Sequence, residues 1–447
     1  MKIDGWLSTA AEAVPEHVAL IADEESVSYG ELDRRAADAA RRLSGLGVGR
    51  GDRVVLVMEP SAEYVVLLHA LVKVGAVAAP LDPRLTDAEL EELAAALGPR
   101  LTVRDAREVL DAPEAGDVEL DETMETESVH CVIHTSGSRG RPKPVELTYG
   151  NQLWNAIGSG VRIGVAPTDL WLCCLPLHHV GGLAIVMRSA LYRTGLVLER
   201  FEPETIAKRL ASDPVTIISL VPTMLSRLLD VSADLGALRC LLLGGGPSPQ
   251  ALVDRALGAG APVTPTYGLT ETASQVATMS PGEAPRKPGS VGPPILTTEV
   301  RIDDDGVICV RGPSVAPGIA DDHGWLRTND VGRLDEDGYL YVLGRADEVI
   351  VTGGENVSPE EVEGVLLGHP AVVDAGVAAR EDLEWQQAVV ASVVVTDGEE
   401  VTEAELREFC RERLAGFKVP KAITFVSELP RNAQGKLLRR ELPTSAD

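Results

Sequence analysis

Cysteine is scarce in this chain, and the few cysteines follow no metal-binding or cross-linking pattern. The 447 residues include 6 cysteines, and no two of them form a CxxC pair. Their spacing indicates neither a zinc site nor a disulfide framework, and it fits a reducing cytoplasm. Cys173 and Cys174 lie in an apolar run, so we expect them to pack in a hydrophobic core.

Positive charge is also scarce. The sequence has 41 Lys and Arg against 68 Asp and Glu, which gives a formal net charge of −27, and only eight residues are lysines. Because nucleic acids and anionic membranes bind basic surfaces, this balance argues against both as partners. The acid excess fits a protein kept soluble at high salt, and it fits equally well a solvated acidic surface encoded by a GC-rich genome.

A long uninterrupted hydrophobic run is missing as well. The longest apolar stretch, 65–81, contains His69 and Lys73 and is too short and too polar to span a bilayer comfortably. Residues 1–9 have no apolar core and are not typical of a signal peptide. We therefore expect a cytoplasmic protein without stable membrane insertion. Its length predicts two or three globular domains at about 150 residues each.

Strand and helix patterns alternate over the first part of the chain. Ser28 and Glu31 form a predicted capping box for a helix over 28–49, and a strand is expected at 53–58. This alternation predicts an α/β fold, in which helices lie on the faces of a sheet. Further elements are expected as helices at 62–74 and 183–192 and as strands at 76–81, 129–134, 171–175, 215–220 and 238–243.

The pattern changes after about residue 285. Short alternating strands at 300–302, 307–310 and 339–342 with Asp-Gly turns predict a small β subdomain. From residue 348 the order strand, helix, strand, helix, strand predicts a separate α+β domain of about one hundred residues. One helix is expected after the cap Ser358, with Glu361 completing a capping box. A second helix is expected over 403–414, after the cap Thr402. The strands are expected at 389–395 and 423–426.

The stretch 134–144, His-Thr-Ser-Gly-Ser-Arg-Gly-Arg-Pro-Lys-Pro, follows a predicted strand. Glycines let the backbone approach an anion, hydroxyl groups donate to phosphate oxygens, and Lys143 supplies a point charge. The spacing does not match a Walker A loop. The stretch therefore predicts a phosphate-binding loop, with a surface turn as the alternative.

Three further segments combine residues that suit a nucleotide. An aromatic ring and Gly at 267–268 can hold a planar base, Thr270 can bind a phosphate, and Glu271 offers an oxygen ligand for Mg²⁺. A carboxylate such as Asp330 suits the two hydroxyl groups of a ribose. The segment 432–436 places one of the rare lysines, Lys436, in a Gly-containing turn. Taken singly, each segment is also typical of an ordinary turn.

In order and spacing, the segments 134–145, 267–271, 327–330, 344–355 and 432–436 resemble the motifs of the acyl-adenylate-forming enzymes, and the resemblance covers nearly the whole chain. It implies a large multi-lobed α/β domain over 1–345 that binds AMP and the acid. It also implies a small mobile α+β lid over 346–447, hinged near Asp347. ATP, Mg²⁺ and coenzyme A are the implied cofactor and co-substrates.

The resemblance also implies a role for individual residues. Lys436 would bridge the attacking carboxylate and the α-phosphate, Thr270 would contact the α-phosphate, and Glu271 would hold Mg²⁺. Gly353, Gly354 and Glu355 would face the site in the thioester step. The implied nucleotide-binding residues are Thr135, Ser136, Gly137, Ser138, Gly140, Lys143, Gly244, Gly245, Gly246, Tyr267, Gly268, Asp330 and Arg345. Arg139 and Pro144 depart from the usual phosphate-loop residues, Thr and Gly.

The stretches 175–189, 238–247 and 267–275 are most similar to the o-succinylbenzoate–CoA ligases of menaquinone synthesis. Their substrate carries two carboxylates, and the one that does not react needs a donor or cation if it is buried. Arg188 is the predicted cation, Ser274 and Gln275 are predicted polar lining, and His179 is a predicted gate with a catalytic role. Arg188 could instead pair with a surface acid, and His179 could be a core histidine.

These resemblances lead to the hypothesis that the protein is an AMP-forming acid–CoA ligase for 2-succinylbenzoate. A synthetase for another aromatic or short- to medium-chain acid is the main alternative, followed by a luciferase-like oxidoreductase and a non-catalytic AMP-binding module. Retention of Lys436 and Glu271 argues against the last. The expected partners are small molecules, and a homo-oligomer is possible.

Overall fold

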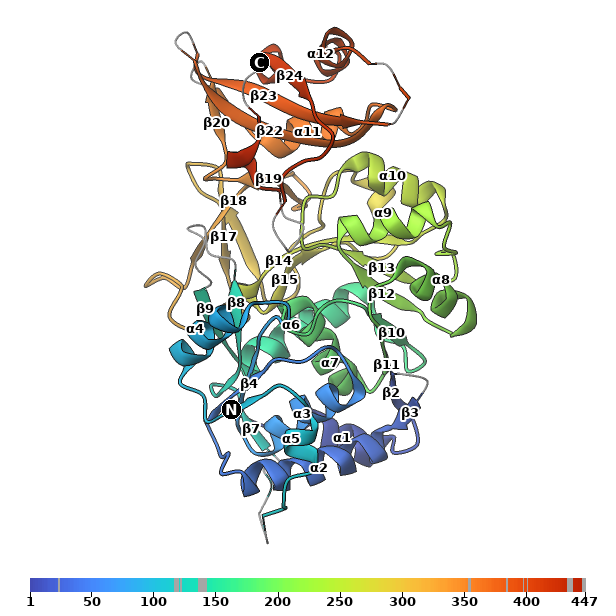
Figure 1. Ribbon diagram of the computed structural model, residues 1–447, viewed down its shortest axis with the longest axis vertical. Coiled ribbons are helices and arrows are strands. Elements are labelled where there is room, and N and C mark those ends of the chain that lie inside the picture. The colour runs from blue at the N-terminus through green and yellow to red at the C-terminus, as the bar shows by residue number, and fades with distance from the viewer. Residues whose placement is uncertain are drawn as a thin grey trace.

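The elements up to β19 form a large body, and those from β20 onward form a smaller unit above it (Figure 1). The predicted α/β fold class is confirmed. The computed structural model describes residues 1–22, 25–115, 120, 123–135, 143–352, 355–382, 385–396, 398–399, 401–431 and 437–443.

The largest sheet of the body has eight strands, and its inner strand pairs are parallel. Its central strand β10 is buried on both faces, because Trp171 and Cys173 pack into one core cluster while Leu172 and Cys174 pack into another. The core position predicted for the adjacent cysteines is thereby confirmed. In spatial order the strands are β15 (Ser274–Thr278), β14 (Val263–Leu269), β13 (Cys240–Leu243), β12 (Ile217–Leu220), β10 (Leu170–Cys173), β11 (Gly195–Leu198), β2 (Val18–Ala22) and β3 (Glu25–Ser28).

A second sheet of the body has five strands, of which β4, β5, β6 and β8 are parallel and β9 is antiparallel at the edge. The β8–β9 hairpin encloses the predicted phosphate loop. A two-stranded ribbon of β1 (Lys2–Asp4) and β7 (Thr123–Glu125) lies apart from it. The five strands in spatial order are β6 (Leu101–Val103), β4 (Arg53–Leu56), β5 (Val77–Pro80), β8 (Val129–Thr135) and β9 (Lys143–Thr148).

Helices cover both sheets, and four of those described begin at Ser or Thr caps. Ser28 Oγ accepts the backbone N–H of Glu31, which confirms the predicted N-terminal cap of α2. That helix ends at Gly45, earlier than predicted, because Val48 N–H turns back to Leu43 O. The helices of the body are α1 (Trp6–Ala13), α2 (Tyr29–Gly45), α3 (Ala62–Lys73), α4 (Asp87–Leu97), α5 (Arg107–Leu110), α6 (Tyr149–Ile163), α7 (Val180–Tyr192), α8 (Pro203–Ser212), α9 (Pro222–Asp230) and α10 (Gln250–Gly258), with short 3₁₀ turns η1 (Thr270–Thr272) and η2 (Ala284–Arg286).

The predicted β subdomain is a four-stranded antiparallel sheet. The predicted Asp-Gly turns lie where expected, at 305–306 between the first two strands and at 337–338 between the last two. The strands are β16 (Glu299–Ile302), β17 (Val307–Arg311), β18 (Leu326–Leu334) and β19 (Leu340–Arg345).

The C-terminal unit is a five-stranded sheet with two helices packed on it (Figure 1). Thr402 caps α12 as predicted, and Glu405 completes a capping box with it. The helix ends at Arg411, earlier than the predicted end at residue 414. The capping box predicted at Ser358 is wrong, because its hydroxyl group lies against Leu343 O and Glu360 Oε2 instead. The elements are β20 (Ile350–Thr352), β21 (Glu355–Val357), α11 (Pro359–Leu366), β22 (Val372–Asp382), β23 (Gln386–Val395), α12 (Glu403–Arg411), η3 (Gly416–Lys418), β24 (Ala422–Phe425) and η4 (Arg439–Glu441).

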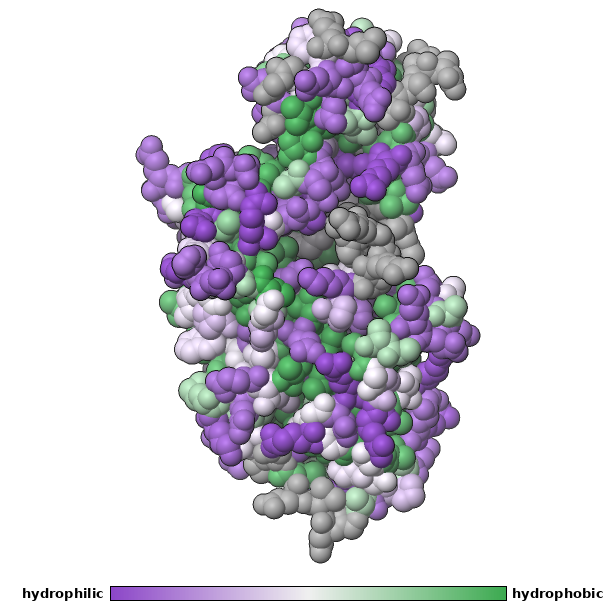
Figure 2. Space-filling model, turned by 90° about the vertical axis from the view of Figure 1, so that its left-hand side faces the viewer, coloured by the Kyte–Doolittle hydropathy of each residue, from purple (hydrophilic) through white to green (hydrophobic). Residues whose placement is uncertain are grey.

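The face shown in Figure 2 carries many hydrophilic side chains, with hydrophobic ones interspersed among them. Among the helices that the structure describes, none combines the length and apolarity needed to cross a membrane.

Candidate functional site

Several predicted motifs follow the carboxyl ends of strands. Thr135 ends β8, Gly244–Gly246 follow β13, and Thr270 and Glu271 follow β14. Strands β13 and β14 are parallel neighbours, so the segments that leave them emerge at the same edge of the sheet. Ligands of α/β proteins bind at such edges, which makes this edge the candidate site.

The predicted phosphate loop is described only at its two ends. Thr135 Oγ1 donates to Lys143 O at 3.3 Å, so the two ends of the loop meet. The Lys143 side chain, at the start of β9, is exposed. Pro144 pairs with His134 in the β8–β9 ladder and does not interrupt it. Ser136, Gly137, Ser138, Arg139 and Gly140 lie outside the described residues.

The turn after β14 is held in an uncommon backbone conformation. Ala273 and Ser274 have φ values of 54° and 115°, a region that residues other than glycine rarely adopt. Gly268 faces this turn, and any Cβ there would overlap Ser274 O. Thr272 Oγ1 donates to Leu269 O at 3.1 Å across the turn. These contacts fix Thr270 and Glu271, which are both half-buried, at the mouth of the site.

Tyr267, Asp330 and Arg345 form one hydrogen-bonded group. Tyr267 Oη donates to Asp330 Oδ2 at 2.6 Å, and Arg345 Nη1 lies 3.3 Å from Asp330 Oδ1. Burial and the adjacent carboxylate raise the pKa of Tyr267, so its phenol stays protonated and donates. Each carboxylate oxygen keeps a free lone pair, because an ionised carboxylate accepts about four hydrogen bonds. The structure thus brings together three residues predicted to bind the nucleotide.

Arg188 lies buried on α7, with 4% of its surface exposed. Its Nη2 donates to Asn155 Oδ1 at 2.6 Å, and Asn155 Nδ2 donates to Thr272 O and Gln275 O at 2.9 and 2.7 Å. Within the described part of the chain, no carboxylate lies in ion-pair range of Arg188. Burial lowers its pKa, although guanidinium groups stay charged in proteins.

Asn155 is a site residue that the sequence reasoning missed. It joins Arg188 to Gln275, so two of the predicted substrate residues meet through it. A signal was present, since Asn151, Asn155 and Ser159 recur every four residues in helix α6 and are all buried. Such a stripe puts polar groups on one helix face, where they need partners from another element.

His179 has a different environment from Arg188. Its ring lies 4.5 Å from that of His178, whose Nε2 is 3.6 Å from Asp82 Oδ2. Burial lowers the pKa of both histidines, so both are neutral at pH 7. The described contacts thus place His179 beside Asp82, at the start of helix α7, and a neutral imidazole there can accept or donate a single proton.

The segment from β19 to β21 carries the remaining predicted residues. Arg345 Nε lies 3.4 Å from Oδ1 of Asp347, which is exposed between β19 and β20. Glu355 is exposed at the start of β21. Gly353, Gly354 and Lys436 lie outside the described residues.

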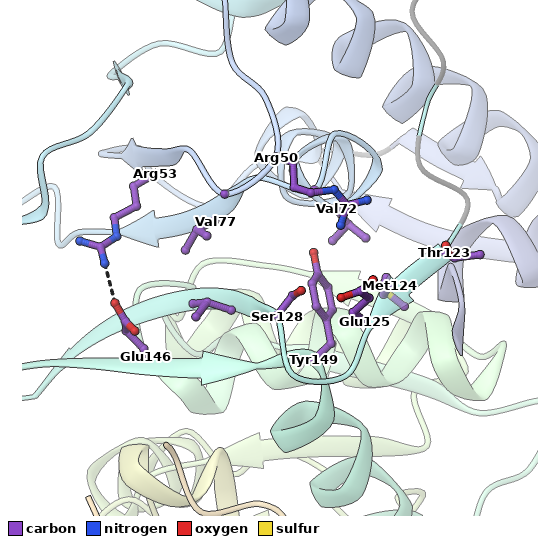
Figure 3. Close-up of a pocket in the computed structure, with 13 residues that line it drawn as sticks. Arg50, Arg53, Val72, Val77, Thr123, Met124, Glu125, Ser128, Glu146 and Tyr149 are labelled. Carbon is purple, nitrogen blue, oxygen red and sulfur yellow. Dashed lines mark hydrogen bonds and ion pairs between the residues drawn. The ribbon is translucent and has the colours of Figure 1, made fainter. Parts of the chain in front are cut away.

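A cavity of about 240 Å³ lies elsewhere in the body (Figure 3). Residues at the amino ends of β4, β5 and β8 line the cavity, which therefore lies opposite the edge where Thr135 ends β8. Arg53 Nη2 pairs with Glu146 Oε1 at 2.5 Å across one wall, and the Tyr149 ring stands in the centre. The predicted site residues that the structure describes do not line this cavity, so it is separate from the candidate site.

Comparisons with protein families match two models. The model described as AMP-binding enzyme matches residues 7–320, and the model described as AMP-binding enzyme C-terminal domain matches residues 361–436. The two matches together span most of the chain.

Individual relatives match over the whole length. The 2-succinylbenzoate–CoA ligase of Bacillus cereus is 40% identical, covering 98% of this chain and 97% of its own. The structure of o-succinylbenzoate CoA synthetase from Bacillus subtilis with the acyl-adenylate intermediate gives a TM-score of 0.92 at 34% identity, covering 100% and 99% of the two chains. Its complex with ATP and magnesium ion gives 0.91, with 99% and 100% covered. A double mutant of that enzyme with a product analogue gives 0.75 at 35% identity, with 99% and 98% covered.

Proposed function

The chain belongs to the AMP-binding enzyme family, and we propose that it is an ATP-dependent ligase that joins 2-succinylbenzoate to coenzyme A. The reaction runs through an acyl-adenylate and releases pyrophosphate, then transfers the acyl group to the thiol and releases AMP. A carboxylate is a poor electrophile, and its adenylate is a mixed anhydride with a good leaving group. The Bacillus relatives that match nearly the whole chain at 34% to 40% identity carry this activity in their names and support the proposal.

The nucleotide would lie along the edge described above. The Asp330 carboxylate, held by Tyr267 and Arg345, has the acceptor capacity for a ribose diol. Thr135, Lys143 and the loop between them would bind the β- and γ-phosphates, and the Gly244–Gly246 turn would lie beside adenine. The last assignments rest on the family resemblance.

Glu271 fits a magnesium site. It is half-buried on a turn fixed by hydrogen bonds, and Ala316 N donates to its backbone oxygen at 2.9 Å. Among the residues that the structure describes, none donates to the Glu271 carboxylate, so it can serve as a metal ligand. Mg²⁺ prefers such oxygen ligands and would supply positive charge near the phosphates. Thr270 would donate to the α-phosphate, and Lys436 would offset the repulsion between two anions as the carboxylate attacks.

The choice of acid rests on one observation, the buried Arg188. A buried cation without a carboxylate partner is costly, and a second carboxylate on the substrate would neutralise it. Ser274 and Gln275 would line the same pocket, and neutral His179 would border the acyl group as a gate. A monocarboxylic acid would leave Arg188 without its partner, which disfavours the alternative of a simple fatty or aromatic acid.

The enzyme would use two arrangements of its domains. We place the domains at 1–345 and 346–447, with Asp347 as the hinge. The similarity is higher to the acyl-adenylate complex of the relative than to its product-analogue complex at nearly equal coverage, which supports a second arrangement. Gly353, Gly354 and Glu355 would face the site in that second arrangement, during the thioester step.

The test measures the two half-reactions separately. Purified protein with ATP, Mg²⁺ and 2-succinylbenzoate should release pyrophosphate without coenzyme A and form the thioester when it is added. Lys436→Ala should lose pyrophosphate release and retain thioester formation from supplied acyl-adenylate. Equal loss of both steps would remove Lys436 from that role, and no acid-dependent pyrophosphate release from the wild-type protein would refute the function.

A further inference from the structure

The segment that carries Lys436 begins and ends at a paired stem. Arg431 and Leu437, on either side of 432–436, form an antiparallel bridge, and Leu438 N donates to Pro430 O at 2.9 Å. Arg439 is the next residue and starts η4. Whatever holds Arg439 therefore also holds the base of the segment that carries Lys436.

Arg439 is held by three carboxylates. Its Nε donates to Glu348 Oε2 at 2.6 Å, its Nη2 donates to Glu360 Oε1 at 2.9 Å, and its Nη1 donates to Glu363 Oε1. Val377 N also donates to Glu363 Oε1, at 2.6 Å. The Arg439 side chain is 14% exposed, and those of Glu360 and Glu363 are 11% exposed. Buried, multiply hydrogen-bonded pairs of this kind define geometry more than surface pairs do.

Two of the three carboxylates connect Arg439 to other parts of the protein, one to the proposed hinge and one to the body. Glu348 directly follows Asp347, the proposed hinge residue. Glu360 lies against β19, where a Cβ at Gly344 would overlap Glu360 Oε2. Gly344 has a φ of 139°, so a side chain there would be strained as well as crowded. Ser358 Oγ lies within hydrogen-bonding range of Leu343 O on the same strand.

We propose that Arg439 is a positioning residue, which ties the base of the Lys436 segment to Glu348 at the hinge and, through Glu360, to Gly344 on the body. This inference rests on the proposed function and gives a physical reason why the base of the segment that carries Lys436 would be held during adenylation. The guanidinium of Arg439 is engaged by the three carboxylates, so Arg439 would act through the paired residues on either side of 432–436 and through helix α11, whose first turn docks on β19.

The test compares the half-reactions in three variants. Arg439→Met should lower kcat for pyrophosphate release by about 10²-fold, since a displacement of about 1 Å costs that much. The KM for ATP and the rate of thioester formation from supplied acyl-adenylate should change by less than about threefold, and Arg439→Lys should restore part of the loss. Gly344→Ala should show the same split, because it displaces Glu360 and leaves Arg439 intact.

Two further variants separate positioning from folding. Glu348→Gln keeps two of the three carboxylates and should lower adenylation in a fully folded protein, so it decides the matter if Arg439→Met unfolds. Arg411→Met removes an exposed guanidinium, 2.6 Å from Glu408, in the same unit and should leave both half-reactions unchanged. A wild-type protein that performs neither half-reaction refutes the proposed function. An active wild type whose Arg439 and Glu348 variants keep adenylation, or lose both steps equally, refutes only the positioning role.

Discussion

Replacing Arg188 by Met should remove recognition of the second carboxylate and little else. Arg188 is 4% exposed, and the described partner of its guanidinium is the neutral amide of Asn155. Removing one partner of a buried charge pair costs about 3 to 5 kcal/mol, which predicts a loss of kcat/KM for 2-succinylbenzoate of about 10²- to 5 × 10³-fold. The free protein should be destabilised by no more than about 1 kcal/mol, because removing a buried cation without a described anionic partner offsets the loss of its hydrogen bond to Asn155.

The assay pairs this variant with a trimmed substrate. Each of two analogues of 2-succinylbenzoate lacks one of its carboxylates. The assay uses the analogue that still forms an adenylate, because that one retains the carboxylate that reacts. With this analogue, wild type and Arg188→Met should differ in kcat/KM by less than about fivefold, since the interaction is already absent. Ser189→Ala, which removes a buried hydroxyl without a hydrogen-bond partner from the next position of α7, is the matched control. Equal losses with the diacid and the analogue would refute the reasoning.

Further variants test the nucleotide site and the fold. Asp330→Asn should raise the KM for ATP by about 10- to 100-fold. Tyr267→Phe should raise this KM less, because Tyr267 only orients the carboxylate. Steady-state kinetics at saturating acid measure both effects, and a larger KM for Tyr267→Phe than for Asp330→Asn would indicate that the tyrosine binds ATP itself. Asp33→Asn should destabilise the protein by about 3 kcal/mol in urea unfolding, since Lys73 Nζ, 2.8 Å from Asp33 Oδ1, stays buried without its carboxylate, and adding Lys73→Met should recover much of this. Burial, reinforced by a neighbouring histidine, lowers the pKa of His130 from 6.5 to about 4. The unfolded chain therefore takes up the proton first, and the free energy of unfolding falls by about 1.4 kcal/mol per pH unit as pH drops from 6.5 towards 4. His130→Phe should reduce that slope, and an unchanged slope would contradict the assignment.

Most of the architecture followed from local patterns in the sequence. The cap at Ser28, the alternation of buried strands and helices, and the Asp-Gly turns at 305–306 and 337–338 all depend on near neighbours in the chain, and each appears in the structure. The same holds for the cap at Thr402. Of the candidate site, the nucleotide-binding residues were predicted through motifs, because motif order carries information that one residue lacks, and their roles stay predictions.

What the sequence did not predict depends on distant contacts. Asn155 matters because it meets Arg188 from another helix and the turn near Gln275, 120 residues away. Ser358 has the local pattern of a capping box, but Leu343 of the neighbouring strand attracts its hydroxyl group. Arg439 reads as a solvated charge until the fold places three carboxylates around it. Competition of this kind is decided by tertiary structure.

The most direct test of the account is a competition among acids. Purified enzyme with ATP, Mg²⁺ and coenzyme A is given 2-succinylbenzoate together with monocarboxylic aromatic and aliphatic acids, and the thioesters are quantified by mass spectrometry. The ratio of products reports the ratio of kcat/KM values. The account predicts that the 2-succinylbenzoate thioester dominates by about 10²-fold or more over analogues that lack the second carboxylate. A monocarboxylic acid used equally well would contradict the claim that Arg188 selects a diacid.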